Sequence, residues 1–96
     1  MLIKLVEIKN NPDSGRYFLK EILINPAYIV SVEEEKTVTQ EICLNEDRRP
    51  ESLDARTRIV EVTLYDGKKY NIVGTPAIIL KKISGNTRNT RNILKD

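Results

Sequence analysis

The sequence contains no histidine, and this absence removes the side chain that most often serves as a general base near neutral pH. It also removes the usual nitrogen ligand of zinc and the base of Ser–His–Asp and Cys–His sites. Cys43 is the only cysteine, so the chain can form neither an internal disulfide nor a cysteine zinc site. The four glycines are scattered and form no phosphate loop. We therefore expect a protein that is not an enzyme and that uses no cofactor or metal.

Tryptophan is absent too, and four tyrosines and one phenylalanine leave few large side chains for packing or stacking. No apolar run approaches the roughly 18 residues that a membrane-spanning helix needs. The opening residues MLIKLVEIK lack the apolar stretch and cleavage site of a secretory signal. These features predict a cytoplasmic protein without membrane contact, and they show no site for a small-molecule substrate.

Three patterns that could indicate a metal site or a reactive cysteine are better explained as structural features. Glu7-Ile8-Lys9 has the acid–x–Lys spacing of metal-dependent nucleases, but the chain offers no upstream acid, so we expect surface charge. The run 33–35 is all glutamate, but it lacks the alternating oxygens and glycine of a cation loop, which favours a solvated strand end. Cys43 is expected to be a small buried residue of a strand.

The clearest folding signals lie in residues 57–85. Val60, Val62 and Leu64 alternate with polar residues, as expected of a half-buried strand, and Asp66-Gly67 marks a turn. A two-residue turn would place the apolar residues of the two strands on opposite faces. A type I turn at 65–66 with Gly67 in the left-handed position instead pairs Val62 with Tyr70 and Val60 with Ile72. We predict this bulged turn.

A helix is predicted over 76–84, because Thr75-Pro76 is a typical helix start and Gly85 a typical stop. Its expected buried stripe is Ala77, Ile79, Leu80 and Ile83. The segment 86–96 contains two Asn-Thr-Arg copies, and its weak helix formers predict a polar, basic and flexible tail. The expected organisation is a β-rich domain over 1–85 followed by this tail.

The first half of the chain predicts further strands at 2–8, 16–24 and 28–32, separated by the turn signals around 10–15 and Asn25-Pro26. The segment 37–44 is a fourth candidate strand, or half of an arm that becomes ordered against a partner. A long polar connection, 45–58, follows it. The expected fold is α+β and mainly β: a small bent antiparallel sheet or roll of five to six strands with one C-terminal helix.

Charge is distributed unevenly along the chain. Residues 1–55 hold seven basic and eleven acidic residues, a net of −4, while residues 56–96 hold nine basic and three acidic residues, a net of +6. Such asymmetry is expected of a protein that self-associates or has a basic binding face. An ordinary solvated surface is an equally good explanation. The candidate contacts to nucleic acid or a partner are Lys68, Lys69, Lys81, Lys82, Arg88, Arg91 and Lys95. Tyr17, Phe18 and Tyr65 are candidates for base stacking.

The segment 37–58 is the other candidate region for function, because its sequence carries the fewest folding signals. Within it, the candidate protein-interaction residues are Arg48, Arg49, Leu53 and Arg56.

Three pieces of the chain together resemble the small flagellar FlbD/SwrD-type proteins. They are Leu2-Ile3-Lys4-Leu5, the stretch 24–34 with its Asn-Pro-x-x-Ile motif, and the stretch 62–73 followed by an Ile-rich helix. The resemblance covers about half of the chain and implies a small bent-sheet fold and a flagellar role. A bacterial, phage or mobile-element accessory protein with the same fold is the alternative. It transfers no functional residue, and 37–58 and the tail have no counterpart in it.

The sequence therefore predicts a small interaction or regulatory module that acts by protein–protein recognition, with self-association into a homo-oligomer expected because a thin core leaves edge strands to cover. A nucleic-acid-binding regulator that uses the basic C-terminal half is the first alternative. The second alternative is a structural component of a phage particle or appendage.

Overall fold

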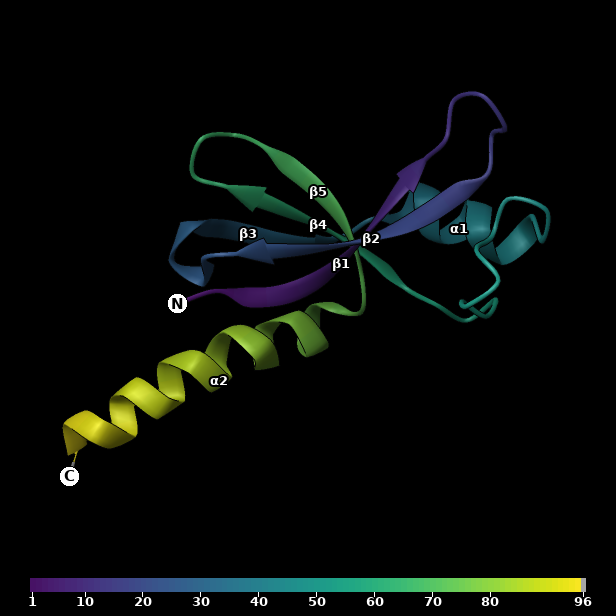
Figure 1. Ribbon diagram of the computed structural model, residues 1–96. Coiled ribbons are helices and arrows are strands. Elements are labelled where there is room, and N and C mark those ends of the chain that lie inside the picture. Colours follow the sequence, from purple (N-terminus) through teal and green to yellow (C-terminus); the bar gives the residue numbers. More distant parts are fainter. Residues whose placement is uncertain (96) are drawn as a thin grey trace.

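The chain forms one five-stranded antiparallel sheet with two helices, in a computed structural model that describes the backbone of residues 1–95 and the side chains of residues 1–85 (Figure 1). The sheet is open, with strand order β2-β1-β5-β4-β3, so that β2 and β3 are its two edges. The elements are β1 (Ile3–Asn10), β2 (Tyr17–Ile24), a 3-10 turn (Pro26–Tyr28), β3 (Ile29–Glu34), α1 (Lys36–Leu44), β4 (Ile59–Leu64), β5 (Lys69–Val73) and α2 (Pro76–Lys95). The predicted α+β class with dominant strands is confirmed.

The bulged hairpin predicted for β4 and β5 is confirmed in its register. Val62 pairs with Tyr70 and Val60 pairs with Ile72. Gly67 has a φ of 88° and donates its N–H to the Leu64 carbonyl at 2.9 Å. Because a glycine has no Cβ, it holds this left-handed conformation at low cost. The turn therefore places Val60 and Val62 on the same face as Tyr70 and Ile72.

Two small cores lie on opposite faces of the sheet, each under one helix. The α2-side core consists of Ile3, Leu5, Ile24, Val60, Val62, Ile72 and Ile79. The α1-side core consists of Ile8, Tyr17, Ile42 and Ile59. Figure 1 shows α1 at one end of the strongly twisted sheet, while α2 lies under the other end and projects beyond it. Because side chains alternate along a strand, consecutive residues of β4 enter different cores.

The strand predicted at 37–44 is wrong, because residues Lys36–Leu44 form helix α1. Glu35 caps the helix, since its carboxylate accepts hydrogen bonds from the Thr37 and Val38 amides at 2.9 and 3.3 Å. Val38 and Ile42 are four residues apart, so the helix turns both toward the α1-side core, where Ile42 is fully buried. Cys43 is consequently exposed on the helix surface, and the prediction that it is buried is also wrong.

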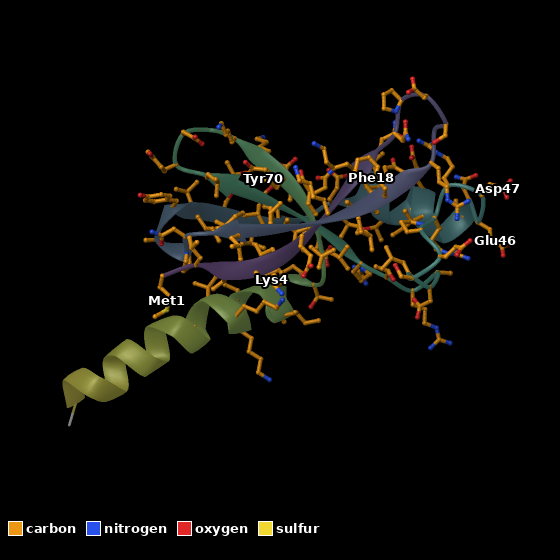
Figure 2. The ribbon with its side chains drawn as sticks, in the orientation of Figure 1. Met1, Lys4, Phe18, Glu46, Asp47 and Tyr70 are labelled. Atoms are coloured by element: carbon orange, nitrogen blue, oxygen red, sulfur yellow. The ribbon has the colours of Figure 1, made fainter. Side chains whose placement is uncertain are left out.

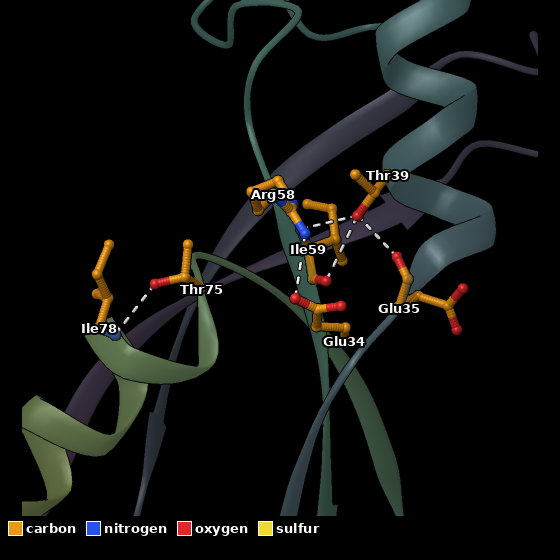
Figure 3. Close-up of polar contacts among 7 residues, drawn as sticks. All are labelled: Glu34, Glu35, Thr39, Arg58, Ile59, Thr75 and Ile78. Carbon is orange, nitrogen blue, oxygen red and sulfur yellow. Dashed lines mark hydrogen bonds and ion pairs between the residues drawn. The ribbon is translucent and has the colours of Figure 1, made fainter.

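The start of α2 is confirmed, but its predicted end at Gly85 is wrong. Thr75 accepts a hydrogen bond from the Ile78 amide at 3.2 Å, and the helix continues through Gly85 to Lys95 (Figures 1 and 3). Ile79 is fully buried and Ile83 packs beside it, as expected for the stripe. Ala77 and Leu80 are exposed instead. The helix therefore contacts the sheet along a narrower face than the sequence predicts.

Glu7 is buried, with only 8% of its surface exposed, so the expected surface charge at this position is wrong. The reason is its place in β1, between β2 and β5, where it lies opposite Lys20 and Ile72. It follows Leu5 on the same side of the strand, so the alternation that buries Leu5 also buries Glu7.

Candidate interaction surfaces

The connection between α1 and β4 is held to the rest of the protein by arginine side chains. Arg48 forms an ion pair with Glu41 at 2.8 Å and donates from Nε to the Gly15 carbonyl at 2.7 Å. Its guanidinium also stacks on the Tyr17 ring, 4.9 Å from the ring centre. The Tyr17 amide in turn donates to the Arg48 carbonyl at 2.9 Å. Arg48 therefore joins the connection to β2, α1 and the first turn at once.

Two further arginines make similar contacts. Arg49 donates to the Ile42 carbonyl at 3.0 Å, at the C-terminal part of α1. Arg16 donates to the Asp47 and Arg49 carbonyls, both at 3.1 Å. Leu53 packs against the α1-side core. Of the four candidate interaction residues in this segment, Arg48, Arg49 and Leu53 thus make internal contacts, whereas Arg56 is exposed.

Tyr17 lies at the centre of this arrangement. Its hydroxyl donates a hydrogen bond to the Glu41 carboxylate at 2.5 Å. Burial of the ring, followed by this hydrogen bond and the negative charge of Glu41, raises the pKa of Tyr17 to about 12. The protonated Tyr17 hydroxyl therefore stabilises the folded state. Tyr17 is a structural residue here rather than a surface for stacking bases.

The predicted basic contacts do not form one cluster among the described side chains. Lys69 forms an ion pair with Glu61 at 3.6 Å, and Lys82 donates to the Lys4 carbonyl at 3.3 Å. Lys68 lies in the β4–β5 turn and Lys81 on α2, and Figure 1 shows these elements on different parts of the molecule. The side chains of the other candidates, Arg88, Arg91 and Lys95, lie outside the described residues.

Two exposed tyrosines lie together beside the β4–β5 turn. The rings of Tyr28 and Tyr65 are 5.0 Å apart, and 48% and 68% of their surfaces are exposed. Of these two residues only Tyr65 was predicted to stack bases, and Phe18, another predicted stacking residue, lies separately on β2 (Figure 2).

The two sheet edges differ in how well they are protected. The Arg16 carbonyl accepts a hydrogen bond from the Asn11 amide within the β1–β2 hairpin, whereas the Tyr17 amide donates to the Arg48 carbonyl outside the sheet. Because backbone groups alternate in direction along an edge strand, those of the odd-numbered residues of β2 point away from β1. The connection therefore covers one end of this edge. Exposed charged side chains at Lys20 and Glu21 protect the middle of the strand, and the exposed apolar residues Phe18 and Leu23 flank them.

The β3 edge is different, because an apolar groove runs along it. The Glu35 amide donates to the Ile59 carbonyl at 2.9 Å, so the backbone groups of Glu35 face β4. Because the direction alternates from one residue to the next, the backbone groups of Val32 and Glu34 point away from β4. Beside them lies a groove of about 290 Å³ between β3 and α2, lined by Pro26, Ile29, Val30, Ser31, Val32, Leu80 and Ile83. Val30 and Leu80 are 63% and 54% exposed. Unpaired backbone groups and exposed apolar side chains thus occur together.

Sequence reasoning did not single out this groove. A strand was predicted at 28–32 and the structure has it at Ile29–Glu34, but the packing of α2 beside β3 brings together residues about 50 positions apart in the sequence. The exposed Leu80 was expected to be buried, and the apolar pattern of the helix gave no signal to the contrary.

Comparison of the chain with protein-family models, with curated proteins and with solved structures gives no match. The resemblance to the flagellar FlbD/SwrD-type proteins therefore stays a prediction. No helix within the described part of the chain is both long and apolar enough to cross a membrane.

Proposed function

We propose that this protein is a recognition module that acts by protein–protein contact, and that it associates with a second copy of itself through the edge of β3. The observation that carries the proposal is the unpaired backbone of Val32 and Glu34 beside the apolar groove of β3 and α2. An added strand would satisfy those backbone groups, while its side chains would cover Val30 and Leu80.

A second copy fits this edge because β3 can pair with itself. In an antiparallel pair with its two-fold axis at Val32, each Val32 lies opposite its counterpart and Ser31 of one copy lies opposite Glu33 of the other. Glu34 then faces Val30, the residue at the bulge of β3. No glutamate then opposes a glutamate in this pair, which removes the main repulsion expected between two acidic strand ends. Arg58 further compensates Glu34 through an ion pair at 3.1 Å.

The charges of the groove favour the same arrangement. An antiparallel pair places the acidic end of β3, Glu33 and Glu34, toward the Leu80–Ile83 segment of the other copy. That segment carries Lys81, which is exposed. The opposite net charges of the two halves of the chain therefore attract within the pair.

Sedimentation velocity over a concentration series tests the proposal. The unmodified protein is expected to show a mass of two chains at the higher concentrations, and Val30→Lys is expected to shift it to one chain. Leu23→Lys is the matched control, because Leu23 is 62% exposed on the opposite edge strand, β2. A single chain at every concentration, or equal effects of the two variants, would contradict self-association through β3. Species much larger than two chains would instead support the structural role in a particle or appendage.

The exposed tyrosine pair is the one observation that favours nucleic-acid binding. Tyr28 and Tyr65 are exposed aromatic residues at the β4–β5 turn, which also carries Lys68, a combination that suits a stacked base and its phosphate. Fluorescence anisotropy with single-stranded oligonucleotides at two salt concentrations tests this alternative. Salt-sensitive binding that Tyr65→Ala weakens would support it, and no binding at low salt would reject it.

A further inference from the structure

A second hollow lies on the other side of the molecule, between α1 and the segment that leads into β4. It has a volume of about 680 Å³, within the roughly 300–1,000 Å³ typical of small-ligand sites. Its wall on α1 is formed by Lys36, Thr39, Gln40, Cys43 and Leu44, and its opposite wall by residues 55–59, with Glu34 and Glu35 at one end.

Hydrogen bonds fix the two walls relative to each other. The Thr39 hydroxyl accepts from the Ile59 amide at 2.9 Å and donates to the Glu35 carbonyl at 2.7 Å (Figure 3). The Glu35 amide donates to the Ile59 carbonyl at 2.9 Å. The hollow is therefore formed by the fold itself and needs no rearrangement to exist.

The lining is largely apolar. Ile59 forms part of the lining although 99% of its surface is buried, and Ala55, Cys43 and Leu44 add further apolar atoms. Leu44 is the last residue of α1 and is 70% exposed. A leucine exposed to this extent at the wall of a hollow is poorly explained by stability alone, because it contributes little burial.

The charges at the rim favour an anion. Glu34 is compensated by Arg58, and the Glu35 carboxylate accepts hydrogen bonds from the first turn of α1. Lys36 and Arg56 line the hollow, are exposed, and form no ion pair among the described residues. An occupant with an apolar body and one negative group would match both the lining and these two cations.

We propose that this hollow, which we call the α1 pocket, binds an amphipathic carboxylate of the medium-chain fatty-acid type. The chain of the ligand contacts Leu44, Ala55 and Ile59, and its carboxylate lies between Lys36 and Arg56. This inference does not rest on pairing through β3, because no residue of the α1 pocket except Glu34 belongs to that strand.

Cys43 provides the test, because it lies in the α1 pocket and is the only thiol of the chain. The rate of its alkylation by iodoacetamide is measured by mass spectrometry against increasing decanoate. We expect saturable protection that slows the reaction about tenfold. We also expect Lys36→Ala and Arg56→Ala each to raise the apparent Kd about two- to fivefold, as for partly exposed ion pairs.

Matched controls separate binding from loss of structure. Lys68→Ala removes an exposed cation from the distant β4–β5 turn and is expected to leave the protection curve unchanged. Leu44→Gln, at an already exposed position, is expected to abolish protection while the circular dichroism spectrum stays the same. Absence of saturable protection, or equal protection by decyltrimethylammonium, would overturn the proposal, because the charged rim side chains without an ion pair or hydrogen bond among the described residues, Lys36 and Arg56, are both cations.

Discussion

The guanidinium carbon of Arg48 lies 4.9 Å from the centre of the Tyr17 ring, and the same side chain forms an ion pair with Glu41, whose carboxylate accepts the hydrogen bond of the Tyr17 hydroxyl. A residue of the long connection is thereby fixed to the first residue of β2. This contact makes the connection part of the folded unit.

Arg48→Ala is expected to lower the free energy of unfolding by about 1.5–3 kcal/mol, because it removes an ion pair, a stacking contact and a hydrogen bond from a partly buried position. Urea unfolding measures the change. Arg56→Ala is the control, since Arg56 is exposed and its loss is expected to change stability by less than about 0.5 kcal/mol. If the two variants had equal stability, Arg48 would not be the anchor that its contacts indicate.

Stability is expected to fall at alkaline pH because of Tyr17. Its pKa is raised from 10.0 to about 12 in the folded state, so the folded protein holds the phenol proton more tightly than the unfolded chain. The resulting stabilisation is complete below pH 10 and is lost as the pH rises from 10 through 12. Urea unfolding across this range measures the loss. In Tyr17→Phe the loss should be smaller, and an unchanged alkaline profile would argue against a bound proton at this site.

Gly67→Val is expected to destabilise the protein by at least about 1–3 kcal/mol, since a β-branched residue is strained at a φ of 88°. Apart from the two neighbouring residues in the chain, no atom of the described residues lies within 4 Å of an added Cβ at this position, so the effect would come from the backbone rather than from a clash. Gly67→Asn is the matched variant, because asparagine tolerates this conformation better. Thermal melts in which valine and asparagine behave alike would contradict the bulged turn.

Gly85→Ala distinguishes a continuous helix from one that ends at this residue. Within the helix interior of α2, alanine is expected to stabilise by about 0.5–1 kcal/mol, and outside the helix's own backbone no atom of the described side chains or strands lies within 4 Å of the added Cβ. A glycine that ends a helix in the left-handed conformation would give the opposite sign. Denaturant unfolding together with helix content from circular dichroism measures both quantities, and a destabilised variant with less helix would place the end of α2 at Gly85.

The sheet could be predicted largely from the sequence because its signals are local. Alternation along Val60, Val62 and Leu64 gives the strand, and the need for a common apolar face with Tyr70 and Ile72 gives the bulge at Gly67. Each of these arguments uses residues within about a dozen positions of one another. Local patterns of this kind determine which face a side chain takes before any distant contact forms.

The sequence did not predict helix α1, because the spacing of its apolar residues fits the period of a strand as well as that of a helix. Val38, Gln40 and Ile42 alternate as in a strand, and threonine and valine favour strands, yet Val38 and Ile42 also share one helix face. Glutamate is an uncommon N-cap, so Glu35 gave no clear start signal. The packing of Ile42 into the α1-side core decides between the two, and this packing depends on strands far away in the sequence.

The candidate surfaces were harder to predict because their partners are backbone atoms. Arg48 and Arg49 looked like exposed interaction residues, but they donate to the carbonyls of Gly15 and Ile42. Every residue has a carbonyl, so a sequence cannot show which one an arginine will reach. The β3 groove and the α1 pocket arise in the same way, from elements that meet only after folding.

The placement of the two cores on opposite faces has a consequence for how the protein unfolds. Ile59 and Val60 are neighbours in β4, and 99% or more of the surface of each is buried, yet one packs under α1 and the other under α2. If β4 detaches from one core, the neighbouring residue of β4 is also removed from the other core. The molecule is therefore expected to melt in a single cooperative transition, in which both helices are released together.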